Sequence, residues 1–536
     1  MITRLVRGLS SRSAVPLVAT GRAPAAPVAV GTRAPGLANI QVLRGLAASA
    51  VLVHHTAHYA EALRGAGRPM RALDAMLGLW GVALFFAISG FLMAGLVLRD
   101  RPLAFLSHRI ARIFPTYLAV VALFAGLFAA LGLGFGNLTP LTLSLAPAGP
   151  RAYPLTVEWT LVFETSFYVG LFLVALAGLA RRIVPLALGW LGLMAAAFVM
   201  LPQGAVDLTL PPLYLLPLSG ACIPFAGGLL LPRLIASGRL RPAAGLLALP
   251  LAAACLLVEI DAARWLGGAA AVLLVGAAAT GQQIRGEGPL SRAALALGDG
   301  SYVLYLVHVP VLWLTAQALP ASWPGFAYGL VGIAAALGLA ALLGPLDGAL
   351  YRHLRRRIDA ASPRSLRWGL TLYLLLFFGC AAWGSIETAR NDLRESRARA
   401  ALAGLPPEAW SGRESAEAAL SGRDLGLPAT LRGALEAIEP VSPTEAIVSG
   451  FAYDPARPER GMMLALYCGG RLAGLDRPRR LRADLTARPG FEGAGRQRIG
   501  YRMRIARAAC PADAVPLAIV VDQDGRMATL PGTAGR

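Results

Sequence analysis

The sequence of 536 residues contains no lysine, so all 50 of its basic residues are arginine, a bias to which we assign no function. Charged residues of both signs make up only 15% of the chain, whereas 56% of it is hydrophobic. This composition excludes an ordinary soluble globular protein and predicts a polytopic membrane protein. The segment before Ser385 contains 28 arginines and 12 acidic residues, whereas the segment after it contains 22 and 18. The excess positive charge therefore belongs to the membrane part, where it occurs in short clusters and not on one continuous face. Because nucleic-acid binding needs such a face, nucleic acid is not an expected partner.

Three further absences narrow the function. No internal repeat is visible, and no spacing of His, Cys, Asp or Glu suits a metal, so we expect no metal cofactor. The adjacent residues His54 and His55 would point about 100° apart on a helix and could not grip one ion together. Neither Ser89 nor Ser301 lies in a G-x-S-x-G turn, so we interpret both as helix-packing residues and not as nucleophiles.

Apolar runs are abundant, and each is about 20 residues long, enough to cross about 30 Å of hydrocarbon. Eleven candidate spans lie near 40–60, 75–98, 114–134, 159–180, 183–201, 211–231, 243–260, 265–284, 296–318, 325–350 and 367–384. If the N-terminus is cytoplasmic, arginines gather in the inward loops, with one exception at 61–74. The pattern therefore predicts a multi-pass protein of the bacterial inner (cytoplasmic) membrane with a cytoplasmic N-terminus.

The two ends of the chain differ from this membrane part. Residues 1–39 contain arginines but no acid and are broken up by Pro, Gly and Ala, which predicts a disordered basic cytoplasmic tail. After the additional span at 367–384, residues 386–436 resemble a helical connector, and 441–531 carry the short β-type runs of a small all-β sandwich. An odd number of spans places this sandwich outside, in the periplasm or beyond.

Cysteine usage agrees with an exported C-terminal domain. Cys468 and Cys510 are the only two cysteines outside the apolar spans, and they can pair where oxidation is permitted. The alternative is that both are merely buried small apolar residues. The segment 441–531 contains no histidine and no serine-hydrolase motif, so we expect it to position a glycan or a partner enzyme and not to perform chemistry.

The first span carries two polar side chains on one face. In "LRGLAASAVLVHH", Arg44 and His55 are eleven residues apart, close to three helical turns, and would be separated by about 16 Å. Ionisable residues are costly in hydrocarbon and usually have a function there. The alternatives are that Arg44 is an interface residue whose charge reaches water, and that His55 makes a structural hydrogen bond to a neighbouring helix.

Four later stretches contain similar polar residues inside or beside apolar runs. They are "GLWGVALFFAISGFLM" (78–93), "SHRIARIFPTY" (107–117), "VEWTLVFETSFYVG" (157–170) and "LGDGSYVLYLVHVPVL" (297–312). Together with the first span, and in this order, they resemble the signature of the membrane-bound acyltransferase family 3, the O-acyltransferases that modify surface polysaccharides and related glycans. The resemblance covers about residues 38–350 and implies an acyltransferase membrane domain over 40–350, with about ten helices plus the additional span.

The resemblance implies roles for particular residues. The family histidine, held to be catalytic, falls on His55, and the family arginine falls on Arg44. The paired-arginine block falls on Arg109 and Arg112. The remaining matches are Trp159, Glu164, Ser301, Tyr302, Tyr305 and His308, with Ser89 and Tyr168 in the same blocks. Two positions depart from the family pattern, since Ala83 and Thr165 stand where acidic or polar residues are common.

The residue types suit transfer of an acyl group, most simply acetyl, from acyl-CoA to a hydroxyl of a surface or exported glycan. Imidazole at His55 can accept the hydroxyl proton, and Glu164 can orient the ring as in catalytic triads. Arg44, Arg109 and Arg112 would hold the coenzyme phosphates at the cytoplasmic entrance.

Each of these assignments has an alternative. Glu164 can form a buried ion pair, Arg109 and Arg112 can be ordinary cytoplasmic charge, and His308 can make a structural bond between spans. Trp159, Tyr168, Tyr302, Tyr305 and Ser89 can bind substrate or be structural. A transporter of a glycan or small molecule is the alternative function, but it predicts a repeated, symmetric pair of halves. Polysaccharide-assembly enzymes are candidate partners.

Overall fold

The fold was analysed on a computed structural model of the chain. It describes residues 37–66, 68–201, 210–320, 322–427, 430–440, 445–455, 462–478, 480–482, 485, 498–511 and 514–531. The basic tail expected at 1–39 falls almost wholly outside the described residues. Of its last residues, Ala38 and Asn39 already belong to the first helix.

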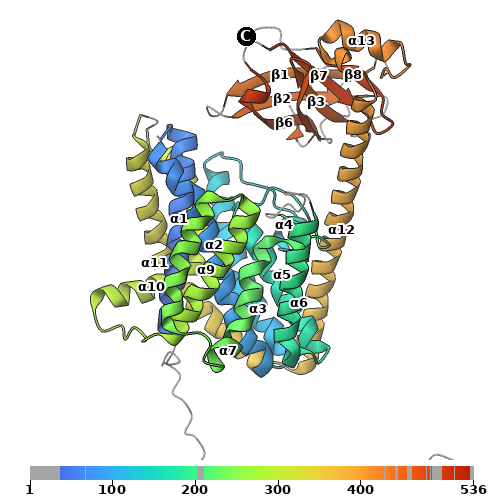
Figure 1. The fold of residues 1–536 in the computed structure, drawn as a ribbon. Coiled ribbons are helices and arrows are strands. Elements are labelled where there is room, and N and C mark those ends of the chain that lie inside the picture. Colours follow the sequence, from blue (N-terminus) through green and yellow to red (C-terminus); the bar gives the residue numbers. More distant parts are fainter. Residues whose placement is uncertain are drawn as a thin grey trace, which may run out of the picture.

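A bundle of long helices forms the first three quarters of the described chain (Figure 1). Its principal helices are α1 (Ala38–Arg64), α2 (Arg68–Arg99), α3 (Pro102–Ala130), α5 (Glu158–Leu176), α6 (Ile183–Met200), α9 (Ile260–Thr280), α10 (Pro289–Ala318), α11 (Gly325–Ala360) and α12 (Pro363–Ala403). Among the described residues, eight helices are long and apolar enough to cross a membrane, and α1, with 27 residues, is also long enough. The predicted polytopic helical fold is confirmed.

Two predicted spans differ from the single long helices expected at 211–231 and 243–260. The first contains short turns at Leu216–Leu218 and Gly220–Cys222 followed by α7 (Ile223–Ala236), and the second is divided into Pro242–Leu247, α8 (Ala248–Ala254) and Cys255–Leu257. Prolines at 212, 217, 224 and 242 explain the interruptions, because a proline lacks the backbone N–H that continues a helix.

Helix α3 begins earlier than the apolar run from residue 114 indicated. It begins at Pro102, a residue well suited to the first turn of a helix, so Arg109 and Arg112 lie inside the helix and not at a loop junction. Three residues apart, the two side chains share one face of α3. Between α3 and α5, the chain contains only the short helix α4 (Pro140–Leu143).

The last long helix forms a stalk. Helix α12 continues through the expected connector to Ala403, because no proline interrupts it, and carries a β domain beyond one end of the bundle (Figure 1). A short turn at Pro407–Trp410 and α13 (Arg413–Ser421) follow, and the first strand starts at Arg432, within the predicted connector of 386–436. The stalk contacts the bundle through the 3.5 Å ion pair between Arg151 and Glu387.

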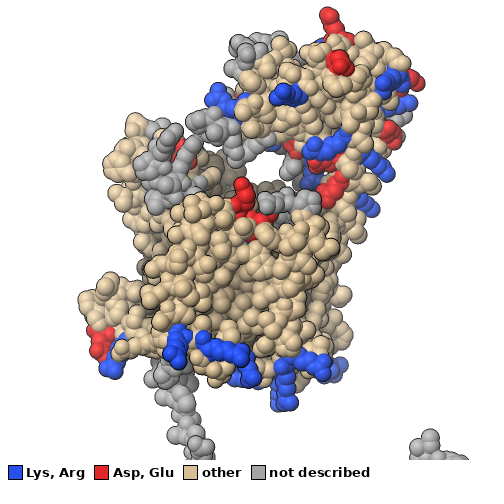
Figure 2. Space-filling model, in the orientation of Figure 1, with Lys and Arg blue, Asp and Glu red and all other residues tan. Residues whose placement is uncertain are grey.

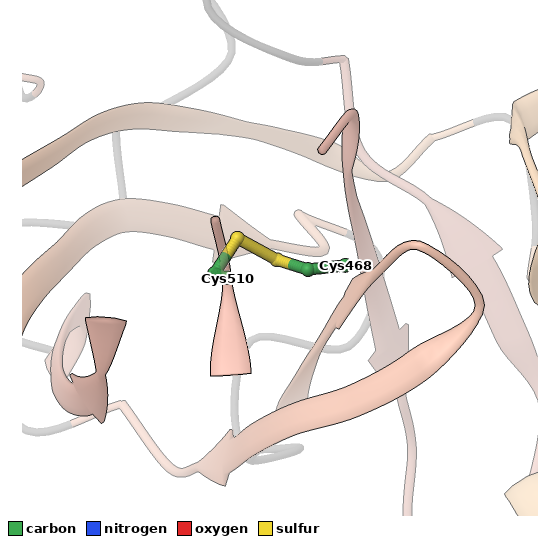
Figure 3. Close-up of a disulfide and its surroundings, with 2 residues drawn as sticks. All are labelled: Cys468 and Cys510. Atoms are coloured by element: carbon green, nitrogen blue, oxygen red, sulfur yellow. A yellow bond between two sulfur atoms is a disulfide. The ribbon is translucent and has the colours of Figure 1, made fainter. Parts of the chain in front are cut away.

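The C-terminal domain is a sandwich of two antiparallel sheets, as the sequence predicts. Its strands are β1 (Arg432–Pro440), β2 (Glu445–Tyr453), β3 (Met463–Cys468), β4 (Arg471–Asp476), β5 (Arg480–Leu481), β6 (Arg498–Ala506), β7 (Pro516–Val521) and β8 (Met527–Thr529). One sheet has the order β1-β2-β6-β5 and the other β4-β3-β7-β8. The expected bond between Cys468 and Cys510 is present and closes a loop with a sequence separation of 42 (Figure 3).

Arginine side chains gather at the end of the bundle away from the β domain (Figure 2). This is also the end at which the described chain starts, because Asn39 donates a 3.1 Å hydrogen bond to the carbonyl of Ala278 near the end of α9. Helices α1 and α10 run in the same direction, since Arg64 at the end of α1 bonds the carbonyls of Ala316 and Leu319 at the end of α10. The bundle therefore has one arginine-rich end and one end that faces the β domain.

Candidate active site

An inner cavity of about 220 Å³ opens toward the arginine-rich end of the bundle. Its position follows from residues that line it near this end, namely Arg44 near the start of α1, Arg109 and Arg112 on α3, and Tyr351 near the end of α11. Its remaining walls are largely apolar and come from α2, α5 and α10. The residues that the sequence predicted to bind the donor are thus brought together in one cavity from separate helices.

The three arginines of this cavity are held in different ways. Arg112 donates a 2.7 Å hydrogen bond from Nη1 to Oδ2 of Asp347, whose side chain is only 3% exposed. The hydroxyl of Thr116 bonds the other oxygen of Asp347, also at 2.7 Å. The Arg112 guanidinium further lies over the rings of Tyr302 and Tyr351, at 5.0 and 5.5 Å from their centroids. Arg112 is therefore neutralised and fixed by the protein itself.

Arg109 and Arg44 make weaker contacts than Arg112. Arg109 donates a 3.3 Å bond to the hydroxyl of Tyr351, and its buried Nε has no hydrogen-bond partner within the described part of the chain. Arg44 donates a 3.3 Å bond to Gln41 on its own helix. These two guanidinium groups keep N–H donors that can form hydrogen bonds to an anionic ligand, whereas Arg112 is already paired with the carboxylate of Asp347.

Glu164 lines the same inner cavity and accepts a hydrogen bond from the hydroxyl of Tyr168. Ser89 lies 3.4 Å from that hydroxyl, between oxygen atoms, and also lines the cavity. The hydroxyl of Tyr302 donates a 2.8 Å bond to the carbonyl of Ile113 and so ties α10 to α3. The carboxylate, two tyrosines and a serine therefore form the polar lining beside the arginines.

An outer cavity of about 230 Å³ lies nearer the end that faces the β domain. It is lined by Gly78 early in α2, Trp159 in the first turn of α5 and Ile260 at the start of α9. His54 and His55 both line it. The predicted catalytic histidine is therefore in a different cavity from the three arginines.

Close packing of α1 and α10 brings two distant histidines together. A Cβ on Gly298 would overlap the carbonyl group of Gln41, so the two helices approach more closely than larger residues would allow. His55 and His308 each lie ten residues beyond the contact of Gly45 with Gly298, and the helices run in the same direction. The ring nitrogens His55 Nδ1 and His308 Nε2 are 3.1 Å apart.

When both rings are neutral, the hydrogen bonds around this histidine pair determine which nitrogen of each ring carries the proton. His308 Nδ1 is 3.1 Å from the carbonyl oxygen of Leu304, which only accepts, so Nδ1 carries the proton and Nε2 is an acceptor. His55 Nδ1 faces two acceptors, the Val51 carbonyl at 3.0 Å and His308 Nε2 at 3.1 Å, and therefore donates. The second nitrogen of His55, Nε2, consequently keeps its lone pair and can act as a base.

A thin wall separates the inner and outer cavities. Val82, Phe86 and Tyr305 line both of them. The hydroxyl of Tyr305 is fixed by a 3.0 Å bond to the carbonyl of Val157 and a 2.6 Å contact with the hydroxyl of Thr160. One layer of side chains therefore stands between the arginine-lined cavity and the histidine-lined cavity.

The structure gives His55 a partner other than the expected one. The expected partner of His55 was Glu164. Instead, Glu164 bonds Tyr168, and His55 bonds His308.

The structure also shows the surroundings of the two residues that depart from the family pattern. Ala83 lines the outer cavity, and the hydroxyl of Thr165 donates a 2.7 Å bond to the carbonyl of Leu145 and so fixes the preceding loop.

Sequence reasoning missed Asp347, which pairs with Arg112 of the inner cavity, and Arg264, which lines the outer cavity. Asp347 lies inside the apolar run 325–350, where an ionisable residue was the signal that would have drawn attention to it, whereas Arg264 lies between the runs 243–260 and 265–284. Ser301 is fully buried, and its hydroxyl has no partner among the described residues, so the structure gives it no catalytic neighbour. Within those residues, no cluster of His, Cys, Asp and Glu is arranged to hold a metal ion.

A bundle of helices long and apolar enough to cross a membrane, with an arginine cavity, a histidine cavity and an appended β domain, defines a polytopic membrane protein. Residues 37–345 match the family described as an acyltransferase domain, more than half of the chain. The chain therefore belongs to acyltransferase family 3 and is a membrane-bound acyltransferase. No curated protein and no solved structure matches it. The family assignment made from the five sequence blocks is confirmed, and it leaves the transporter alternative without support.

Proposed function

We propose that this protein transfers an acetyl group from acetyl-CoA, bound at the arginine-rich end, to a hydroxyl of an exported or surface glycan at the other end. The observation that carries the proposal is the pair of cavities that share Val82, Phe86 and Tyr305. In this arrangement, donor and acceptor approach from opposite ends of the bundle. The donor thioester needs to pass only one layer of side chains to reach His55.

The charge distribution supports a cytoplasmic donor. Arginine-rich ends of membrane proteins face the cytoplasm, which contains acyl-CoA, so the arginine-rich end in Figure 2 is assigned to that side. The N-terminus is then cytoplasmic, and the β domain lies outside a bacterial inner membrane. Arg44 and Arg109 would bind the coenzyme phosphates, which guanidinium groups match with paired hydrogen bonds. Arg112, already paired with Asp347, would contribute positive charge and a fixed wall to the same cavity.

The chemical step requires a base beside the acceptor hydroxyl. His55 Nε2 removes the hydroxyl proton as the acceptor oxygen attacks the thioester carbonyl carbon, and the carbon–sulfur bond then breaks. The products are an acetyl ester on the glycan and the thiol form of the coenzyme, once a proton reaches the leaving thiolate. His308 holds the His55 ring and stabilises its positive charge, the role that the sequence had suggested for Glu164. Glu164 and Tyr168 are catalytic candidates on the donor side, where their hydrogen bond can relay a proton to the thiolate.

The β domain would position the glycan, or polysaccharide-assembly enzymes that carry it, above the outer cavity. In support, α12 suspends the domain over that end of the bundle, with open space between them (Figure 2). The domain contains no histidine after residue 441, so it lacks the residues for a serine-hydrolase reaction of its own.

The function is tested on cells that carry or lack the gene. Mass spectrometry of their surface glycans should show the mass of one acetyl group on the modified sugar, lost in the deletion and restored by the intact gene. Restoration should fail with the His55→Ala variant. Identical glycan spectra from all strains would contradict the assigned acceptor class.

A further inference from the structure

The charged or imidazole side chains that the structure describes around the outer cavity are all basic. They belong to His54, His55 and Arg264, and no described lining residue is an aspartate or glutamate. Arg264 comes from the first turns of α9, whereas the two histidines come from α1. Imidazole and guanidinium groups in a partly buried cavity favour a ligand with negative charge, because that charge replaces water at a low-dielectric site.

The residue at position 83 strengthens this charge bias. An acidic residue is common at this position in the family pattern that the sequence resembles, and the structure shows that Ala83 lines the outer cavity. Ala83 therefore adds no negative charge to the cavity that contains His55. The nearest acid on α9, Asp261, precedes Arg264 by three residues and does not line the cavity.

The cavity also has features suited to a sugar ring. Trp159 contributes an indole to its wall, and aromatic faces pack well against the apolar faces of sugars. A Cβ on Gly78 would come within 2.8 Å of the His54 ring, so the glycine lets that imidazole lie against α2. Apolar contact and positive charge are therefore combined beside the proposed base.

We propose that the acceptor is an acidic sugar whose carboxylate is bound by Arg264 while its ring packs on Trp159. This deepens the proposed function and depends on it for the identity of the reaction. Guanidinium binds carboxylate through paired hydrogen bonds and has five N–H donors, so contacts with neighbouring protein groups still leave donors for a ligand. With the carboxylate held there, a hydroxyl of the same sugar lies within the cavity that contains His55.

Two simple probes test the proposal on the full-length protein in detergent or nanodiscs. Calorimetry compares the binding of methyl β-glucuronide with that of methyl β-glucoside, which differ only at C6, a carboxylate in the first and a hydroxymethyl group in the second. Because a charge-assisted hydrogen bond contributes about one factor of ten in affinity, the uronide should bind about tenfold more tightly. Equal affinities, or no detectable binding of the uronide, would overturn the proposal. Tighter binding of glucose 6-phosphate than of the uronide would overturn the choice of a carboxylate.

Variants assign the effect to the cavity. Arg264→Gln should bring the two affinities close together, Arg264→Lys should keep part of the difference, and Ala83→Asp should weaken uronide binding by adding a negative charge. Arg292 is an exposed arginine near the start of α10 and does not line the outer cavity, so Arg292→Gln is the matched control and should keep the wild-type ratio. An unchanged ratio in both Arg264→Gln and Ala83→Asp, each shown by thermal unfolding to be folded, would contradict the proposal.

Failure of the proposal and failure of the function give different results. If the uronide is preferred but neither sugar is acetylated from acetyl-CoA, the acidic-sugar site is supported and the proposed reaction is wrong. If both sugars bind and react equally well, the reaction is supported and the acidic-sugar site is wrong.

Discussion

His55 on α1 and His308 on α10 are bonded to each other through ring nitrogens 3.1 Å apart. The bond is possible because α1 and α10 cross closely where Gly45 meets Gly298. It fixes the orientation of the His55 ring and leaves Nε2 of that ring as the acceptor of a proton.

The first prediction separates the two adjacent histidines. His55→Ala should lower acyl transfer by about two to four orders of magnitude, the usual effect of losing a general base, while the protein still inserts and folds. His54→Ala, the matched control, should lose far less activity, because the 3.1 Å bond to His308 is made by His55. Purified variants are assayed for transfer from labelled acetyl-CoA. Similar losses in both variants, or full activity in His55→Ala, would contradict the assignment.

The second prediction concerns His308 as a positioning residue. His308→Leu should lower kcat with little change in the KM for the donor, since the ring of His55 loses one of its two hydrogen-bond acceptors and keeps only the Val51 carbonyl. His308→Gln can present an acceptor oxygen near the position of Nε2 and should restore part of the activity.

Nitrogen-15 spectra of His55 supply a second measurement for the same variants. They should show the proton on Nδ1 in both proteins, because the Val51 carbonyl remains as an acceptor, but a changed Nδ1 chemical shift in His308→Leu, where the second acceptor is lost. An unchanged Nδ1 chemical shift together with lost activity would mean that His308 acts only through packing.

The helical period in the sequence predicted which residues share a face, but not which helices meet. Arg44 and His55 could be placed on one face of α1 because eleven residues are close to three turns. The partner of His55 could not be predicted, because His308 lies 253 residues away and meets it only after α1 and α10 have packed. Glu164 was expected at His55 on chemical grounds, and only the packing of α5 shows that it faces the other cavity.

Helix boundaries show a similar limit. The β sandwich and its disulfide followed from local patterns of strands and cysteines. The start of α3 at Pro102 and the divided helices around α7 and α8 depend on prolines and on neighbouring helices, which an apolar run alone does not reveal. Arg112 was expected to bind phosphate, and its pairing with Asp347 could not be foreseen because the two residues are 235 positions apart.

The third prediction distinguishes the arginines of the inner cavity. Arg109→Glu should weaken coenzyme A binding by at least about tenfold, because a phosphate contact is lost and repulsion is added. Asp347→Asn should destabilise the membrane domain by about 3 kcal/mol or more, because it leaves the buried Arg112 charge without its partner. Calorimetry with coenzyme A and thermal unfolding measure the two effects. Unchanged coenzyme affinity in Arg109→Glu would refute its role as a phosphate ligand.

The fourth prediction concerns the β domain. Truncation after Glu387 keeps the residue that pairs with Arg151 and removes the rest of the stalk and the sandwich. The truncated protein should still acetylate a simple sugar acceptor but should modify the native glycan poorly, because the domain positions that glycan. Complete loss of transfer to both acceptors, in a truncated protein shown to be folded, would mean that the domain belongs to the catalytic machinery.

Sided transfer in proteoliposomes tests the central claim most directly. The protein is reconstituted in one orientation, labelled acetyl-CoA is supplied on only one side of the bilayer, and a sugar acceptor is enclosed on the other. If the inner cavity binds the donor and His55 serves the acceptor, labelled ester should form only when acetyl-CoA is on the arginine-rich side and the acceptor is on the side of the β domain. Ester formation with both substrates confined to the β-domain side, or none in the predicted arrangement from a folded protein, would contradict the account.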